Sequence, residues 1–118
     1  MVRIELPYPP TANNLFINAG RKRVKSPQYK TWIVMASLSV KDSHRQYIGP
    51  YSISIAAKRP DKRKRDIANL EKAVSDLLVT NGVIQDDSLC ERITMTWDAG
   101  INADCVVIVT PFEEGLAA

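Results

Sequence analysis

Alternating hydrophobic and polar positions predict the strands of this chain. Val2, Ile4 and Leu6 alternate with charged residues, which is typical of a half-buried strand over residues 2–6. The same alternation over residues 51–57 and 92–97 predicts two further strands. Residues 105–110 form a continuous apolar run, so we predict a fourth strand there that lies in the centre of a sheet.

Helical periodicity predicts two helices. Ser26 followed by Pro27 is a typical helix start, and the predicted first helix covers residues 26–47. The second covers residues 66–81 and ends at Asn81-Gly82, because glycine readily adopts the left-handed conformation that stops a helix. The core-facing positions are Tyr29, Trp32, Ile33, Ala36 and Val40 in the first helix, and Ile67, Leu70, Val74, Leu77 and Leu78 in the second.

The order of the predicted elements is βαβαββ, which indicates an α+β fold with one mixed β-sheet and helices packed against it. A length of 118 residues suits a single domain, residues 1–118. We interpret residues 7–25 as a long loop. The acidic tail from Pro111 onward is expected to be disordered at its end.

Composition excludes several classes of protein. The chain is 45% hydrophobic and 25% charged, as in an ordinary globular protein. It has neither an apolar run long enough to cross a membrane nor a signal-peptide core, so we expect a cytoplasmic protein with no membrane partner. The two cysteines, Cys90 and Cys105, are expected to pack as small apolar side chains, because a zinc site needs more soft ligands.

The charge is divided unevenly along the chain. Residues 1–65 hold 14 Lys or Arg against three acids, a net charge of +11, whereas residues 66–118 hold two against ten, a net charge of −8. A basic half suggests contact with phosphates, and an acidic half either binds a divalent metal or neutralises the basic half. The basic residues concentrate in 58–65, where six of eight are Lys or Arg, and in Arg21, Lys22 and Arg23, which either contact phosphates or form a solvated loop.

The residues after the basic run are of the kind that metal-dependent phosphodiester cleavage requires. Asp66 ends the run, Lys72 follows on the predicted helix, and Asp86-Asp87 comes just after that helix. Mg²⁺ prefers oxygen ligands, and it activates water and stabilises charge on phosphorus. Asp66 and Asp87 converge only if the chain doubles back at Asn81-Gly82, or if a returning strand or a second protomer completes the site.

Each of these residues also has a simpler structural interpretation. Asp66 is a candidate helix N-cap, and Asp86-Asp87 a candidate acidic turn. Lys72 and Asp76 lie four apart on the helix and are spaced for a surface ion pair worth a few tenths of a kcal/mol. The residues alone leave both interpretations open.

Several motifs together resemble one family. Residues 6–14 (LPYPPTANN), residues 60–66 (PDKRKRD), Asn69-Leu70-x-Lys72, Asp76 and Gly82-x-x-x-Asp86-Asp87 are similar to the RusA-type Holliday junction resolvases, over nearly the whole chain. The resemblance implies a homodimeric endonuclease that uses Mg²⁺, with Mn²⁺ as a substitute, and no small-molecule cofactor. It also implies that the partner is branched DNA, cut at four-way junctions by paired symmetric nicks. Such proteins are common in phages and prophages.

The resemblance also implies roles for individual residues. It places Asp66, Asp87 and Lys72 in catalysis, and the metal on Asp66 and Asp87, with Asp86 as the next candidate. The residues it assigns to DNA are Lys62, Arg63, Lys64, Arg65 and Asn69, together with Arg21, Lys22 and Arg23.

Position 68 departs from the family pattern, because this chain has Ala68 where the family has an aspartate. Either Asp86 or Asp76 supplies the missing carboxylate, or the site works with more water ligands, or the protein binds junctions without cutting them efficiently. We expect an active nuclease. The rival interpretations are a non-catalytic DNA-binding module and a basic ribonucleoprotein component, although the latter gives no reason for Asp86-Asp87.

Overall fold

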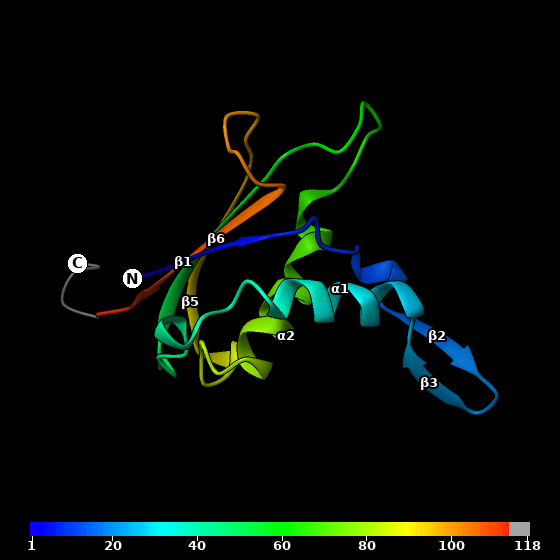
Figure 1. Ribbon diagram of the computed structural model, residues 1–118, viewed down its shortest axis with the longest axis horizontal. Coiled ribbons are helices and arrows are strands. Elements are labelled where there is room, and N and C mark those ends of the chain that lie inside the picture. Colours follow the sequence, from blue (N-terminus) through cyan, green and yellow to red (C-terminus); the bar gives the residue numbers. More distant parts are fainter. Residues whose placement is uncertain (114–118) are drawn as a thin grey trace.

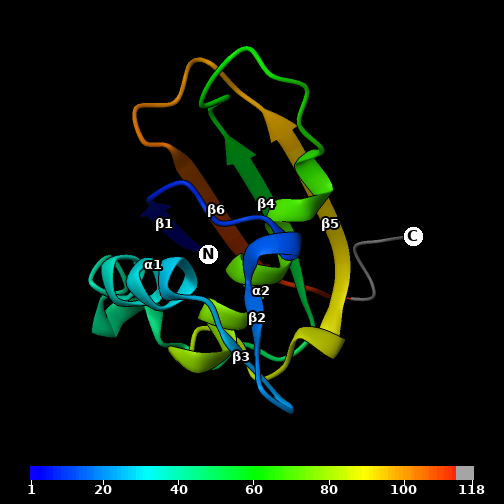
Figure 2. The ribbon, with the colours of Figure 1, turned by 90° about the vertical axis from the view of Figure 1, so that its right-hand side faces the viewer.

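The predicted strands form one mixed sheet. The computed structural model describes residues 1–113, and the predicted disorder at the end of the tail lies outside them. The sheet has the strand order β1-β6-β4-β5, with β1 at Val2–Leu6, β4 at Tyr51–Ala57, β5 at Cys90–Trp97 and β6 at Cys105–Pro111 (Figures 1 and 2). β6 lies inside the sheet, as its apolar sequence predicts. It is antiparallel to both neighbours, and β5 is parallel to β4.

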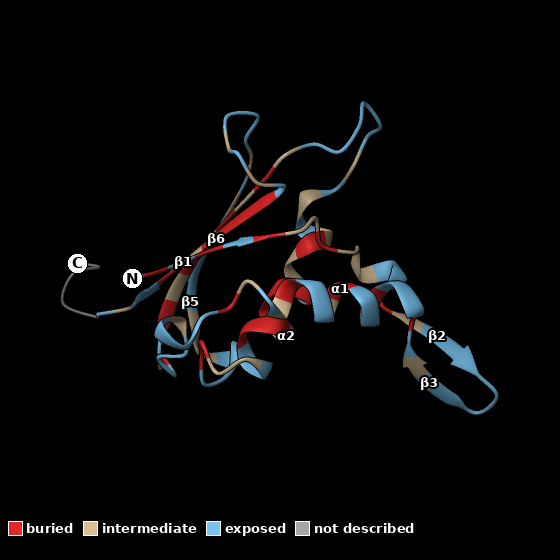
Figure 3. Ribbon diagram, in the orientation of Figure 1, coloured by how far each residue is buried: buried red, intermediate tan, exposed pale blue. Residues whose placement is uncertain are grey.

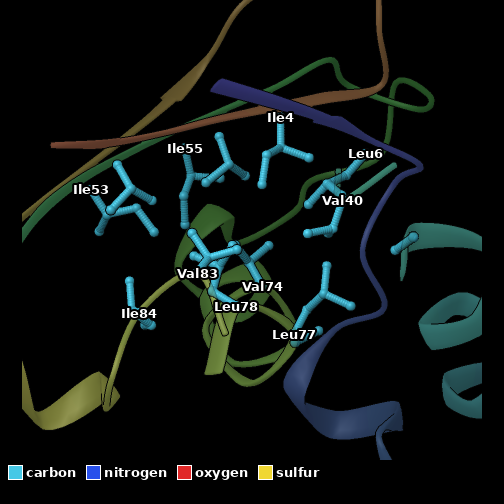
Figure 4. Close-up of a cluster of buried hydrophobic side chains, with 14 of the residues drawn as sticks. Ile4, Leu6, Val40, Ile53, Ile55, Val74, Leu77, Leu78, Val83 and Ile84 are labelled. Atoms are coloured by element: carbon cyan, nitrogen blue, oxygen red, sulfur yellow. The ribbon is translucent and has the colours of Figure 1, made fainter. Parts of the chain in front are cut away.

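The second helix covers one face of this sheet. The predicted helix 66–81 begins as a 3₁₀ turn at Ile67–Leu70 and continues as α2 at Glu71–Thr80. Its apolar side packs against β1 and β4, as the labelled side chains of Figure 4 show. Gly82 has φ +72°, and the Val83 amide donates to the Leu78 carbonyl at 2.9 Å. The chain therefore doubles back directly after α2.

The first helix is shorter than its predicted range of 26–47. Helix α1 covers Pro27–Ser37, and the next amides bond to carbonyls three residues back, which tightens and ends the helix. The polar residues 41–46 offer no apolar side to bury, so nothing continues the helix beyond Val40. Ser26 is the N-cap as predicted, since its hydroxyl accepts from the Tyr29 amide at 3.1 Å.

The interpretation of residues 7–25 as a loop is wrong for their second half. Phe16–Ala19 (β2) and Lys22–Lys25 (β3) pair as an antiparallel hairpin around Gly20, whose φ is +65°. The hairpin projects from the body of the protein and is largely exposed (Figures 1 and 3). With almost no buried positions, it lacks the strong apolar alternation that marks a half-buried strand.

The α+β fold class is confirmed, with the hairpin as a second, two-stranded sheet. β5 begins at Cys90, slightly earlier than predicted. Both cysteines are free, and Cys105 is buried as expected of an apolar side chain. In residues 1–113 no helix has the length and apolar character needed to cross a membrane.

Candidate active site

Four elements meet around one pocket of about 270 Å³. Lys25 comes from the end of β3, Tyr29 from α1, Asp76 from α2, and Asp86 and Asp87 from the segment that follows α2. The rest of the lining is mostly apolar and consists of Ile33, Leu77, Val79 and Thr80. The pocket thus collects three carboxylates and a lysine that lie far apart in the sequence.

The return of the chain after α2 brings Asp87 towards Lys72. Asp87 lies near enough that its charge helps to raise the pKa of Lys72, after the larger effect of the hydrogen bond from Lys72 to Asp76. The chain doubles back at Asn81-Gly82, which is the condition for Asp66 and Asp87 to converge, but the pocket includes Asp87 and not Asp66. Lys72 and Asp87 therefore share one side of α2.

Lys72 is held in place by a small network. Its Nζ donates to Asp76 Oδ1 at 3.1 Å, and the Tyr29 hydroxyl faces Asp76 Oδ2 at 3.4 Å. Burial, together with the charge of Asp76 and its hydrogen bond, raises the pKa of Tyr29 to about 12, so the phenol stays protonated and donates. Asp76 thereby accepts a hydrogen bond on each carboxylate oxygen and positions Lys72.

Asp86 and Asp87 are both exposed at the pocket. Asp86 caps the short 3₁₀ turn Asp87–Leu89, because its Oδ1 accepts from the Ser88 amide at 2.9 Å. This bond from the Ser88 amide holds the pKa of Asp86 below its usual value, so Asp86 is ionised at neutral pH. The adjacent carboxylates of Asp86 and Asp87 are the kind of oxygen ligands that a hard cation binds.

Asp66 lies outside this pocket. It caps the 3₁₀ turn Ile67–Leu70, where its Oδ1 accepts from the Ala68 amide at 3.1 Å, and that turn separates it from the first turn of α2. Ala68 is exposed in the same turn and contributes only its backbone.

The donor set can be compared with the needs of Mg²⁺. Within residues 1–113 no three His, Cys, Asp or Glu side chains form a ready-made metal centre. Mg²⁺ does not need one, because it commonly takes one or two carboxylates, keeps several waters and completes its shell with substrate phosphates. The exposed pair Asp86-Asp87 fits that pattern.

The basic loop between β4 and α2 is ordered by an internal ion pair. Arg65 donates two hydrogen bonds to Asp61, from Nε to Oδ1 at 3.0 Å and from Nη2 to Oδ2 at 2.6 Å. The hydrogen bond from Arg65, aided by the Arg63 amide, lowers the pKa of Asp61 to about 2. Lys62, Arg63 and Lys64 are exposed, and Asn69 is half-buried in the 3₁₀ turn beyond them.

A second basic group lies at the other end of the molecule. Arg21, Lys22 and Arg23 are all exposed at the tip and on one strand of the hairpin. In Figure 2 the loop of residues 58–65 is at the top and the hairpin at the bottom, with the 3₁₀ turn and α2 between them, and in Figure 1 the hairpin lies at the lower right, beyond α1. Two cationic segments therefore flank the region of the pocket.

Comparison with known proteins shows which family this chain resembles. Residues 7–110 match the family described as Endodeoxyribonuclease RusA. The chain is 32% identical over 107 residues to the crossover junction endodeoxyribonuclease RusA of Aquifex aeolicus (strain VF5), covering 88% of this chain and 85% of that protein. It is 35% identical over 89 residues to the protein of the same name from Escherichia coli (strain K12), covering 72% of each.

The chain belongs to the RusA endodeoxyribonuclease family. The resemblance seen in the sequence motifs is thereby confirmed, and RusA-family membership makes the chain a nuclease.

In this RusA-family chain the simpler structural roles of the predicted site residues are also realised. Asp66 is an N-cap, Asp86 caps a turn, and Lys72 pairs with Asp76. A capping carboxylate still has a free oxygen lone pair, so capping does not exclude ligand binding. The structural and functional interpretations are therefore compatible.

Sequence reasoning missed two residues of the pocket, Lys25 and Tyr29. Tyr29 was recognised only as a core residue. Lys25 is at the end of a basic run whose strand pairing the sequence pattern does not reveal, and in the structure it lines the same pocket as Asp86 and Asp87.

Proposed function

We propose that this chain is a Mg²⁺-dependent, homodimeric endonuclease that resolves four-way DNA junctions by paired symmetric nicks in the cytoplasm. The observation that carries the proposal is the pocket lined by Asp86, Asp87, Lys25 and Asp76, with Lys72 bonded to Asp76, in a member of a nuclease family. The relatives' name, crossover junction endodeoxyribonuclease, supports branched DNA as the substrate.

The chemistry is phosphodiester hydrolysis. The oxygen of water forms a bond to phosphorus, the bond from phosphorus to the leaving sugar oxygen breaks, and that oxygen takes up a proton. Asp87 and Asp86 would hold Mg²⁺, and Asp66, which lies outside the pocket, would join them only after a movement of the start of the 3₁₀ turn towards the pocket. When bound, Mg²⁺ activates water and stabilises charge on the phosphate. Lys72, oriented by Asp76, assists at the leaving oxygen.

The basic segments supply affinity. Arg63, Lys64 and Arg65, with Lys62 and Asn69, bind the backbone on one side of the site, and Arg21, Lys22 and Arg23 bind it on the other. Binding that neutralises phosphates releases counterions, so the affinity falls steeply as salt rises. A two-fold homodimer would present two equivalent sites to a junction of near two-fold symmetry, which explains paired nicks.

Cleavage of an end-labelled four-way junction tests this proposal. We expect paired nicks with Mg²⁺ or Mn²⁺, none with a chelator, and none on linear duplex. Asp87→Asn should reduce the rate at least about 100-fold, since losing even an outer-shell partner of a metal costs about 10–100-fold. Asp42→Asn is the matched control, because Asp42 pairs with Arg45 outside the pocket.

Ala68 favours a second candidate function, a non-catalytic junction-binding module. This module would bind junctions without responding to Mg²⁺ or to Asp66→Asn. The variant Ala68→Asp separates the two functions: a gain of nicking from an inactive parent supports the module, and nicking by the parent supports the nuclease. Failure of every version to bind a junction would refute both.

A further inference from the structure

The β2–β3 hairpin has two unlike faces. Its register pairs Phe16 with Lys25 and Asn18 with Arg23, and it pairs Ile17 with Val24 and Ala19 with Lys22. Side chains alternate between the faces of a strand pair. One face, here called the inner face, therefore carries Phe16, Asn18, Arg23 and Lys25, and the opposite face carries Ile17, Ala19, Lys22 and Val24.

Three contacts show that the inner face is directed towards the pocket. The Phe16 ring meets the Tyr29 ring edge-on, with centroids 6.0 Å apart. The Arg23 guanidinium lies over the Phe16 ring at 5.0 Å. Lys25 lines the pocket together with Tyr29, Asp86 and Asp87. The hairpin is thus anchored at its base by aromatic packing, and its inner face carries two cations.

The charges of the pocket make Lys25 distinctive. Lys72, the other nearby lysine, is engaged with Asp76 at 3.1 Å. Lys25 is exposed and forms no ion pair within residues 1–113. A Mg²⁺ ion held by Asp86 and Asp87 would offset their two negative charges, and the phosphate would bring further negative charge into the pocket. Lys25 is the cation of the pocket lining that is available to a phosphate.

We propose that Lys25 contacts the scissile phosphate from the side opposite Asp86 and Asp87, and that Arg23 binds a neighbouring phosphate of the same DNA strand. This inference rests on the proposed nuclease function. Residues two apart on a strand lie about 6.6 Å apart, which is the scale of successive phosphates. Positive charge held at the reacting phosphate stabilises the charge that develops in the transition state.

Helix α1 offers a matched control. Lys30 has the same charge and is exposed, but it lies outside the pocket lining. Lys25→Gln should lower the single-turnover cleavage rate of a bound four-way junction about 100-fold, the usual effect of losing one transition-state donor. Lys30→Gln should leave that rate within about threefold. Lys25→Arg should restore most of the rate, which loss of folding would not allow. Equal rates for Lys25→Gln and Lys30→Gln would overturn the proposal.

A binding measurement tests the same contact without any cleavage. Each phosphate next to the branch point is replaced in turn by a neutral methylphosphonate, and junction affinity is measured for the parent and both variants. At one position the replacement should lower the junction affinity of the parent about tenfold but barely change that of Lys25→Gln. The reason is that the effects of removing a residue and of removing the phosphate it contacts do not add. If no phosphate is coupled to Lys25 more than to Lys30, the proposal fails. Failure of the parent to nick, with this coupling present, would instead refute the proposed nuclease function.

Discussion

The Ser26 hydroxyl joins the base of the hairpin to helix α1, and its removal should be costly. The side chain is almost fully buried, accepts from the Tyr29 amide at 3.1 Å and donates to the Asn14 carbonyl at 2.7 Å. Ser26→Ala removes an N-cap worth about 0.5–2 kcal/mol and leaves a part-buried carbonyl unpaired, at about 1–3 kcal/mol. Because the two effects share one group and do not add fully, we expect a loss of about 2–3 kcal/mol in the free energy of unfolding.

The expected change in melting temperature follows from this loss of free energy and from the length of the chain. With 118 residues the entropy of unfolding is about 0.25 kcal/mol per kelvin, so the midpoint should fall by about 8–12 °C. Thermal unfolding by circular dichroism, with urea titration for the free energy, measures both quantities. Thr11→Ala is the control, because Thr11 also precedes a helical turn but makes no side-chain capping bond to a backbone amide. Equal melting temperatures for Ser26→Ala and Thr11→Ala would refute the reasoning, and Ser26→Thr should retain most of the stability.

Two further perturbations follow from the loop before α2 and the turn after it. The hydrogen bond from Arg65 lowers the pKa of Asp61 to about 2. Any stability that this pair contributes is therefore present above the pKa of the unfolded state, and it is lost as the pH falls through the pKa of the folded state. A carboxyl NMR titration should show a midpoint near pH 2 that returns towards the ordinary aspartate value of 3.8 in Arg65→Gln; an unchanged midpoint contradicts the assignment. Gly82→Ala should destabilise by about 1–2 kcal/mol in urea, since φ +72° strains any residue with a Cβ, whereas Gly49→Ala, with only Gln85 at 3.8 Å, should not.

The sequence predicted the elements that bury an apolar side and missed one that does not. Ile53 and Ile55 alternate with small polar or apolar residues, and their burial in β4 follows from that pattern. The hairpin has no such side, because its Ile17 is 46% exposed and most of its other residues are polar. Its pairing depends on the turn at Gly20 and on the contact of Phe16 with Tyr29, neither of which periodicity detects.

The candidate site was predictable residue by residue but not as an arrangement. Lys72, Asp86 and Asp87 were identifiable from chemistry and spacing. The proximity of Asp87 to Lys72 depends on the return of the chain after Gly82, and that of Lys25 depends on the hairpin register. Both are tertiary contacts between segments whose separation in sequence carries no periodic signal.

The isolated two-stranded sheet has a consequence for how the hairpin behaves in time. A pair of four-residue strands without its own core is marginally stable and opens locally at a small fraction of the global unfolding free energy. Amide hydrogen exchange should therefore be fast in β2 and β3 and slow in β4 and β6, whose register is continuous over seven residue pairs. DNA that binds Arg23 and Lys25 would slow exchange in the hairpin first. The hairpin would then become ordered only when it binds the substrate.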